Sequence, residues 1–135
     1  MSGIVTFSME IELGWGVHDT RNFYRLSENG QEERKYLSEL LGVLEENKIR
    51  FSFDVVGHLF LEECDGQHNS PHSEGWFQAD PGTNYQTAGL FYAPDIIRNI
   101  DSTPIEHEIC THTFSHALFD EISRETCAWE LERAQ

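Results

Sequence analysis

The feature that most constrains the fold is an alternation of short apolar runs with helical patterns along the chain. The apolar runs are rich in β-branched and aromatic residues, which predicts buried strands. These predicted strands are residues 4–13, 49–56 and 108–110. Predicted helices, marked by periodic apolar positions or capping residues, are residues 32–47, 94–100 and 123–134. Because such alternation is typical of parallel strands joined by right-handed crossovers, we expect an α/β fold.

The connections add one unusual segment. After the second strand we expect a short helix at residues 58–64, followed by a long loop at residues 65–84 that is rich in Gly, Pro, His, Ser and Asn. A loop of this length inside a compact domain is uncommon and is often functional. The whole chain, residues 1–135, suits one domain, and its 39% hydrophobic content is enough to build a core.

The chain is strongly acidic, with 24 acidic residues, 9 basic residues and a formal net charge of −15. A surface of this charge repels nucleic-acid phosphates and anionic membranes, so we expect neither as a partner. Only Lys35 and Lys48 are lysines. High acidity with scarce lysine favours a protein of a salt-loving organism, in which salt screens the self-repulsion, over an ordinary acidic cytosolic protein.

The N-terminus and the cysteines bear on the compartment. The first five residues, MSGIV, contain no basic region followed by an apolar stretch, so we expect no secretory signal and a cytoplasmic location. No apolar run approaches the roughly 20 residues of a membrane helix. The three cysteines lack CxxC spacing, which argues against a disulfide framework and a Cys-rich zinc site. Cys64, Cys110 and Cys127 are expected to be buried thiols in a reducing compartment.

The strongest chemical signal is the pair His112 and His116, directly after the third predicted strand. Two histidines four apart lie on one face of a helical turn, where they can share a divalent metal. By itself an HxxxH spacing is better explained by a solvated or core pair. The position changes this preference, because active sites of parallel α/β folds lie at the carboxyl ends of strands.

A second signal is the pair Glu10 and Glu12 at the end of the first predicted strand. Residues i and i+2 of a strand point to one face, and neighbouring carboxylates repel unless a metal or a shared proton relieves them. One carboxylate can then bind the metal while the other acts as a base. The alternative is a solvated strand end. Two histidines and one carboxylate suit zinc and, less well, iron, cobalt or nickel.

Weaker candidates surround these two motifs. Asp54 lies in an otherwise apolar strand, so it is either near the site or hydrogen-bonded inside, and His18 can line the pocket. Trp15 can stack on a sugar ring, although aromatic residues more often belong to the core. His68 and His72 are also four apart, but their place in the long loop favours exposed residues over ligands.

Three segments together resemble a known family. HEICTHTFSH at residues 107–116 resembles the histidine motif of the NodB-homology polysaccharide deacetylases, carbohydrate esterase family four. RFSFDVVGHLF at residues 50–60 resembles the second strand of that family. VTFSMEIELGWG at residues 5–16 occupies the place of the first motif, T-F-D-D-G, but Ser8 and Met9 replace its adjacent aspartates. The acid-x-acid pattern of Glu10 and Glu12, with the acidic composition, resembles variant, haloarchaeal-type members.

The resemblance implies a distorted (β/α) barrel of about seven strands and an enzyme that removes acetyl groups from saccharides. It implies that His112 and His116 bind a divalent metal, with zinc as the expected ion, which polarises the acetyl carbonyl and acidifies water. We assign Glu10 as base and Glu12 as ligand, with the reverse assignment left open. Trp15, His18 and Asp54 are the substrate-binding candidates.

The family's later motifs, which supply an arginine, groove residues and a histidine general acid, have no counterpart in residues 1–135. We therefore expect a partial, incomplete barrel with an open strand edge and an uncovered apolar inner face. Three functions are compatible with this expectation. The first is a metal-dependent hydrolase acting on carbon–nitrogen bonds, other than peptide bonds, of N-acetylated saccharides. The others are a non-catalytic metal- or sugar-binding remnant, and a half-domain that needs a homo-oligomer or a complementary chain.

Overall fold

The computed structural model describes residues 3–135; Met1 and Ser2, on which the expected lack of a secretory signal partly rests, lie outside the described residues. The regular elements are three strands, three α-helices and four short 3₁₀ helices in one alternating order. In chain order they are β1 (Ser8–Ile11), η1 (Leu13–Val17), η2 (Phe23–Arg25), η3 (Glu28–Gly30), α1 (Gln31–Asn47), β2 (Ser52–Val55), η4 (Gly57–Phe60), α2 (Pro94–Asp101), β3 (Glu108–Thr111) and α3 (Arg124–Arg133). No helix among the described residues combines the length and apolar character needed to cross a bilayer.

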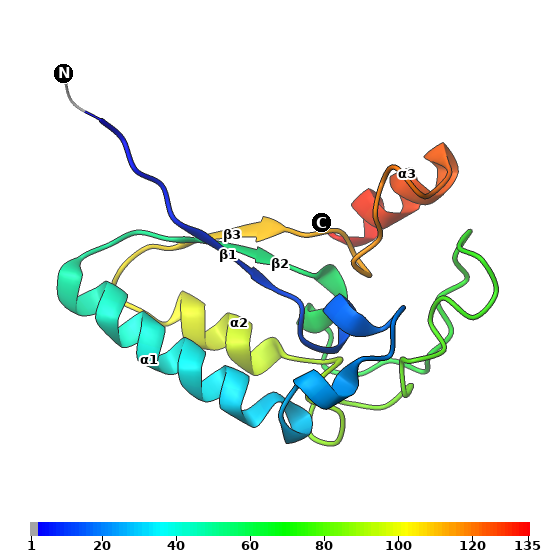
Figure 1. The fold of residues 1–135 in the computed structure, drawn as a ribbon, viewed down its shortest axis with the longest axis horizontal. Helices are drawn as coiled ribbons and strands as arrows, with labels where there is room; N and C mark the ends of the chain where they lie inside the picture. The colour runs from blue at the N-terminus through cyan, green and yellow to red at the C-terminus, as the bar shows by residue number, and fades with distance from the viewer. Residues whose placement is uncertain (1–2) are drawn as a thin grey trace.

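The three strands form one parallel sheet in the order β1-β2-β3. Met9 pairs with Phe53, which in turn pairs with Ile109, so the strands run almost without stagger. Their carboxyl ends point toward the end of the molecule that holds α3 and the long loop (Figure 1). The expected α/β class is confirmed. What residues 3–135 form is a small open sheet, and no closed barrel is present within them.

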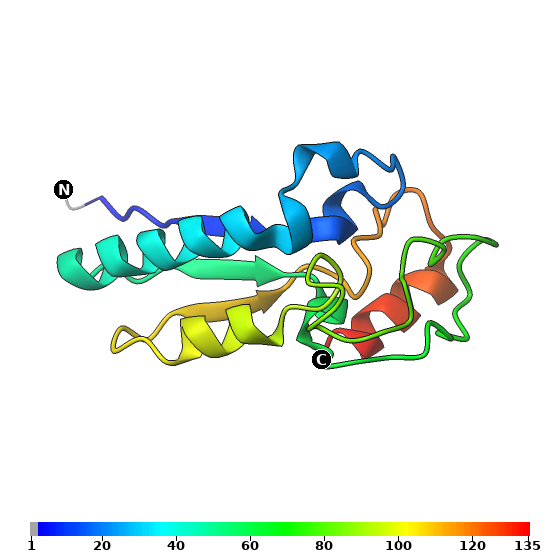
Figure 2. The ribbon, with the colours of Figure 1, turned by 90° about the horizontal axis from the view of Figure 1, so that it is seen from below.

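One face of the sheet is covered by α1 and α2 (Figure 2). Phe53 and Val55 of β2 are fully buried against these helices, because alternate strand residues point to the same face. The helices contribute apolar positions at three- and four-residue spacing, which are Leu37, Leu41 and Leu44 of α1 and Ile96 and Ile100 of α2. The helical periodicity of the sequence therefore identified the core face correctly.

The opposite face of the sheet is polar, which corrects the expectation of an uncovered apolar inner face. In register across the strands, Glu10 lies beside Asp54 and Asp54 beside Cys110. Apolar surface is instead exposed at the edge of β1, in a groove of about 640 Å³ between this strand and α1. Met9, Leu26 and Tyr36 are among its lining residues. Among the described residues, β1 has a partner strand on one side only.

Two predicted elements are shorter than expected. The first strand begins at Ser8, and Ile4 and Val5 are 93% and 76% exposed. They lack a partner because β2 begins only at Ser52, after Lys48 has ended α1 in a left-handed conformation. The helix expected at residues 58–64 is the short 3₁₀ helix η4, after which the chain enters the long loop.

The last helix ends against the turn that carries the two histidines. Ser123 caps α3, as predicted, by accepting a hydrogen bond from the Thr126 N–H at 3.1 Å. The fully buried carboxylate of Glu130 accepts hydrogen bonds from the N–H groups of Phe114 and Ser115, at 2.7 and 2.8 Å, and from the Ser115 hydroxyl. Its other contact is His72 Nε2 at 2.7 Å. Glu130 thus joins α3, the histidine turn and the long loop.

Replacing Glu130 with Gln should lower the free energy of unfolding by about 1–3 kcal/mol, because the amide NH₂ cannot accept the hydrogen bonds that one carboxylate oxygen accepts. Glu132→Gln, an exposed change on the same helix, should stay within about 0.5 kcal/mol of the parent. Urea unfolding followed by circular dichroism measures both. Equal stability of the two variants would show that Glu130 does not anchor the turn.

Candidate functional site

The predicted site residues come from the carboxyl ends of the two outer strands. Glu10 lies in β1 and Glu12 directly follows it, while His112 and His116 follow β3. Parallel strands bring these ends to the same edge of the sheet, although Glu12 and His112 are 100 positions apart in sequence. The histidine motif and the acidic motif are therefore neighbours in space.

Glu12, His112 and His116 form a compact group. Oε1 of Glu12 lies 2.9 Å from His116 Nε2 and 3.1 Å from His112 Nε2. The three potential ligand atoms all lie within 4.8 Å of one another. Each side chain is about one quarter exposed, so the group is accessible from solvent. Glu10 is more exposed, at 61%, and its Oε1 lies 3.9 Å from His112 Nε2.

The segment between the histidines is a tight turn, which corrects the expectation of a helical turn. Thr113 and His116 both adopt positive φ, at 61° and 63°. The N–H groups of Gly57 and His58 donate to the carbonyls of Thr113 and Phe114, each at 2.8 Å, and so hold the turn against the end of β2. A Cβ atom at position 57 would lie 3.2 and 3.1 Å from backbone atoms of Phe114 and Ala134, so a larger residue would have to push these segments away by a few tenths of an ångström.

The charges in this group favour a cation. The hydrogen bond with His116 lowers the pKa of Glu12, which keeps this carboxyl ionised. The same hydrogen bond raises the pKa of His116. Both shifts have one cause, since this hydrogen bond is strongest between an ionised carboxyl and a protonated imidazole. Two imidazole nitrogens and one carboxylate oxygen that converge in this way fit a divalent metal. Because a histidine ligand binds metal in its unprotonated form, the affinity should fall as the pH falls.

Asp54 and Trp15, two of the substrate-binding candidates, differ in accessibility. Asp54 lies on the open polar face beside Glu10, which favours a place near the site over a hydrogen-bonded place in the interior. Trp15 is fully buried, donates its indole N–H to the Phe91 carbonyl at 3.3 Å and packs on the His58 ring. It therefore has no free face for a sugar ring and belongs to the core.

His18 is also buried, which leaves little of its ring accessible to a substrate. Its Nδ1 lies 2.7 Å from the Trp15 carbonyl, so this nitrogen donates, while Nε2 has no hydrogen-bond partner among the described residues. Burial lowers the pKa of His18, which keeps the ring neutral.

The long loop holds residues whose burial the sequence did not indicate. His68 and His72 were expected to be exposed, but both side chains are buried. His72 contacts Glu130, and His68 lies in a cluster with His58, Cys64 and Asp80. The only local signal for this cluster is the His58–Cys64–His68 spacing after the second strand, because Asp80 is 12 residues further along the chain. All three cysteines are free thiols and are only partly buried.

Comparison with known proteins identifies a family. A polysaccharide deacetylase family model matches residues 26–135, which includes β2, β3 and both histidines of the turn. Searches of curated proteins and of solved structures found no match. The parallel sheet, with the histidine turn at its carboxyl edge, is consistent with part of a deacetylase domain. The chain therefore belongs to the polysaccharide deacetylase family.

Proposed function

We propose that this chain is a metal-dependent hydrolase that removes acetyl groups from N-acetylated saccharides, cleaving a carbon–nitrogen bond other than a peptide bond. Glu12, His112 and His116 would hold the metal, with zinc as the best-suited ion. The observation that carries the proposal is the convergence of two imidazole Nε2 atoms on one carboxylate oxygen at an accessible strand edge. Family membership supports the deacetylation chemistry.

When bound, the metal supplies Lewis acidity that polarises the acetyl carbonyl and acidifies water. The chain's own contribution is a base beside that position. Glu10 suits this role because it is exposed, lies 3.9 Å from His112 Nε2 and makes the longer of the two carboxylate contacts to that histidine. Glu12 suits the ligand role because both histidines contact its Oε1. Glu10 would take a proton from the attacking water as the C–O bond forms.

The open face of the sheet suits an acetylated saccharide. Asp54, next to Glu10 in register, is a carboxylate that can accept hydrogen bonds from sugar hydroxyls. Trp15 and His18 do not reach this face, so we leave them out of the proposed substrate surface. A cytoplasmic location and a high-salt environment remain predictions from composition, and assays belong in concentrated salt for that reason.

A second candidate is a half-domain that becomes active with a complementary chain or a second copy. The apolar groove beside the unpaired edge of β1 favours it, since such edges pair readily with another strand. A non-catalytic protein that binds metal or sugar is the third candidate. Turnover by the chain alone separates the proposed function from both.

We expect the His112→Ala/His116→Ala double variant to bind about one equivalent of metal fewer than the parent chain, because a lone carboxylate cannot retain zinc. Elemental analysis after dialysis against zinc in high salt measures this. His107→Ala is the matched control, since His107 lies at the amino end of β3, away from the group. Equal metal content in the parent and the double variant would contradict the proposed metal centre.

Glu10→Gln should lower kcat for acetate release from N-acetylglucosamine oligomers by roughly 10²–10⁴-fold while the bound metal is retained. Glu12→Gln should lose metal together with activity. Glu39→Gln, an exposed carboxylate change on α1, is the control and should match the parent. Metal loss in Glu10→Gln but not in Glu12→Gln would reverse the two assignments. A metal-loaded parent that releases no acetate would favour the other two candidates.

A further inference from the structure

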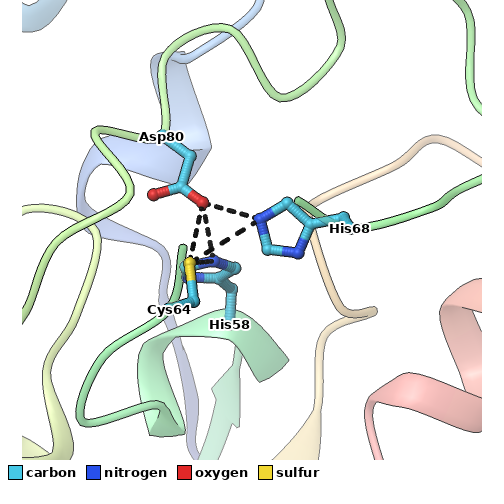
Figure 3. Close-up of side chains that lie close together, drawn as sticks. All are labelled: His58, Cys64, His68 and Asp80. Carbon is cyan, nitrogen blue, oxygen red and sulfur yellow. Dashed lines mark hydrogen bonds and ion pairs between the residues drawn. The ribbon is translucent and has the colours of Figure 1, made fainter. Parts of the chain in front are cut away.

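A second group of potential ligands lies inside the long loop, away from the open face of the sheet. His58 comes from η4, and Cys64, His68 and Asp80 come from the loop that follows (Figure 3). Four different side chains thus point at one small volume, with all four potential ligand atoms within 4.8 Å of one another. The proposed hydrolysis does not use these residues.

We propose that His58 Nε2, Cys64 Sγ, His68 Nε2 and Asp80 Oδ2 form a closed, tetrahedral site for a structural divalent metal, with zinc as its ion. A thiolate combined with imidazoles selects zinc among the common divalent metals. On binding, the Cys64 thiol releases its proton to solvent and the sulfur becomes the fourth ligand.

The interatomic distances match the edges of such a tetrahedron. Around zinc, edges between nitrogen and oxygen ligands are about 3.3 Å, and edges that include sulfur are about 3.5 Å. Asp80 Oδ2 lies 3.2 Å from His58 Nε2 and 2.6 Å from His68 Nε2. Cys64 Sγ lies 3.8 and 3.9 Å from these two nitrogens and 3.2 Å from Asp80 Oδ2. The contact between His68 Nε2 and Asp80 Oδ2 departs most from these edges, at 2.6 Å against about 3.3 Å, so an ion would have to part these two atoms.

The hydrogen bond on the far side of His58 presents a lone pair to the cluster. Its Nδ1 lies 3.0 Å from the carbonyl oxygen of Phe91, which only accepts, so Nδ1 carries the proton. In the neutral ring, Nε2 is then unprotonated and faces the Asp80 carboxylate. Two acceptors in contact repel each other, and a cation between them removes that repulsion. Histidine metal ligands in proteins are oriented by this kind of outer hydrogen bond.

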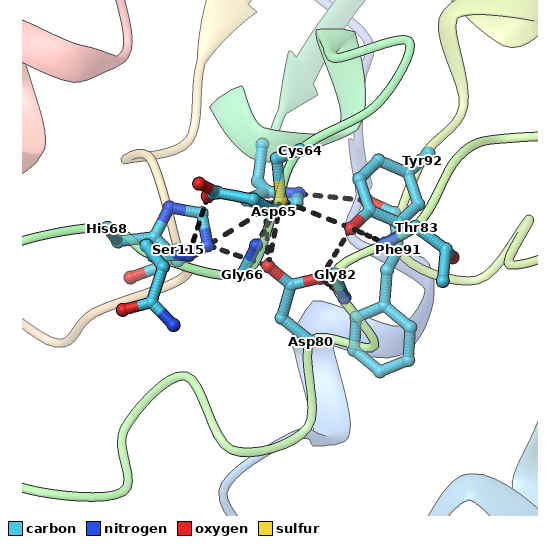
Figure 4. Close-up of polar contacts among 12 residues, drawn as sticks. Cys64, Asp65, Gly66, His68, Asp80, Gly82, Thr83, Phe91, Tyr92 and Ser115 are labelled. Carbon is cyan, nitrogen blue, oxygen red and sulfur yellow. Dashed lines mark hydrogen bonds and ion pairs between the residues drawn. The ribbon is translucent and has the colours of Figure 1, made fainter.

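Other groups hold the remaining ligands in place (Figure 4). Asp80 uses its second oxygen, Oδ1, to accept hydrogen bonds from the Tyr92 hydroxyl at 2.6 Å and the Gly82 N–H at 3.1 Å. The Gly66 N–H donates to Cys64 Sγ at 3.3 Å. The side chains of His58 and Asp80 have no exposed surface, and that of His68 is 6% exposed. Four protein ligands in a buried site leave no position for substrate, which is typical of a structural metal.

The geometry argues against a nucleophilic Cys–His–Asp arrangement. In such a relay, the carboxylate contacts one ring nitrogen of the histidine and the nucleophile contacts the other. Here Asp80 and Cys64 both lie on Nε2 of His68, and the same is true of His58. The four groups surround a point rather than forming a chain.

A metal at this point would close a segment that has little regular structure of its own. Between η4 and α2 the chain makes one isolated β-bridge, Glu63 to Asn84, and otherwise turns and bends. Loops of this length readily adopt several conformations, and a bound metal would restrain this one. The site joins the start of the loop to its later half at Asp80, which packs under Tyr92 just before α2.

Cobalt(II) titration of the parent chain tests the proposal, because a cobalt–thiolate bond absorbs strongly in the near ultraviolet and the Glu12 group has no thiol. We expect this band to appear with about one equivalent of cobalt and to vanish when zinc is added. Cys64→Ser should lose the band. Cys127→Ser should keep it, because Cys127 lies outside the cluster and its thiol donates to the Phe119 carbonyl. Tyr92→Phe should weaken binding by about 10–100-fold.

Cysteine mapping gives an answer that does not depend on any variant folding. In the parent, zinc should slow alkylation of Cys64, located by mass spectrometry, by about tenfold or more and leave Cys127 unchanged. Absence of the band in the parent, its persistence in Cys64→Ser, or zinc-independent alkylation of Cys64 would each overturn the proposal. The band should persist in His112→Ala/His116→Ala, so failure at either site is distinguishable from failure at the other.

Discussion

The constraint on which the rest of the structure depends is that parallel strands must end at the same edge of their sheet. Both crossovers return through helices on one face, α1 after β1 and α2 after β2, so that face becomes the core. The opposite face is left polar, and the carboxyl edge carries the histidine turn and the long loop. Glu12 and His112 meet there across 100 positions of sequence because both follow strands that end at this edge, on either side of β2. The chemistry of the molecule follows from this geometry.

Two buried carboxylates hold the irregular segments at that edge. Glu130 accepts hydrogen bonds from N–H groups of the histidine turn. Asp80 accepts hydrogen bonds from the Tyr92 hydroxyl and from the Gly82 N–H in the long loop. A buried carboxylate is costly unless hydrogen bonds satisfy it, so each anchors its surroundings in one arrangement. The positive φ of Thr113 and His116 is tolerated because the surrounding hydrogen bonds over-determine the turn. Glu130 is therefore a positioning residue for the two histidines.

The sequence predicted those parts of the molecule in which a local pattern determines the structure. Helix α1, helix α3 with its Ser123 cap, and the alternation of strands and helices along the chain follow from periodicity and capping. The neighbourhood of Glu12 and the two histidines follows from their place after parallel strands. The conformation of the turn was not predictable, because Glu130 and Gly57, which hold it, are distant in sequence. His68 and His72 carry no apolar pattern, and their burial depends on partners 12 and 58 residues away.

The two histidine-containing groups differ in the way that catalytic and structural metal sites differ in proteins. Glu12, His112 and His116 offer three ligands, each about one quarter exposed, and leave room for a further ligand from solvent. His58, Cys64, His68 and Asp80 offer four ligands, of which three have buried side chains and Cys64 is partly buried. A closed set of four excludes water, whereas an open set of three admits it. Trp15 packs on the His58 ring, and η1, which contains Trp15, begins directly after Glu12. A metal bound in the loop would thus also restrain the backbone next to the proposed ligand Glu12.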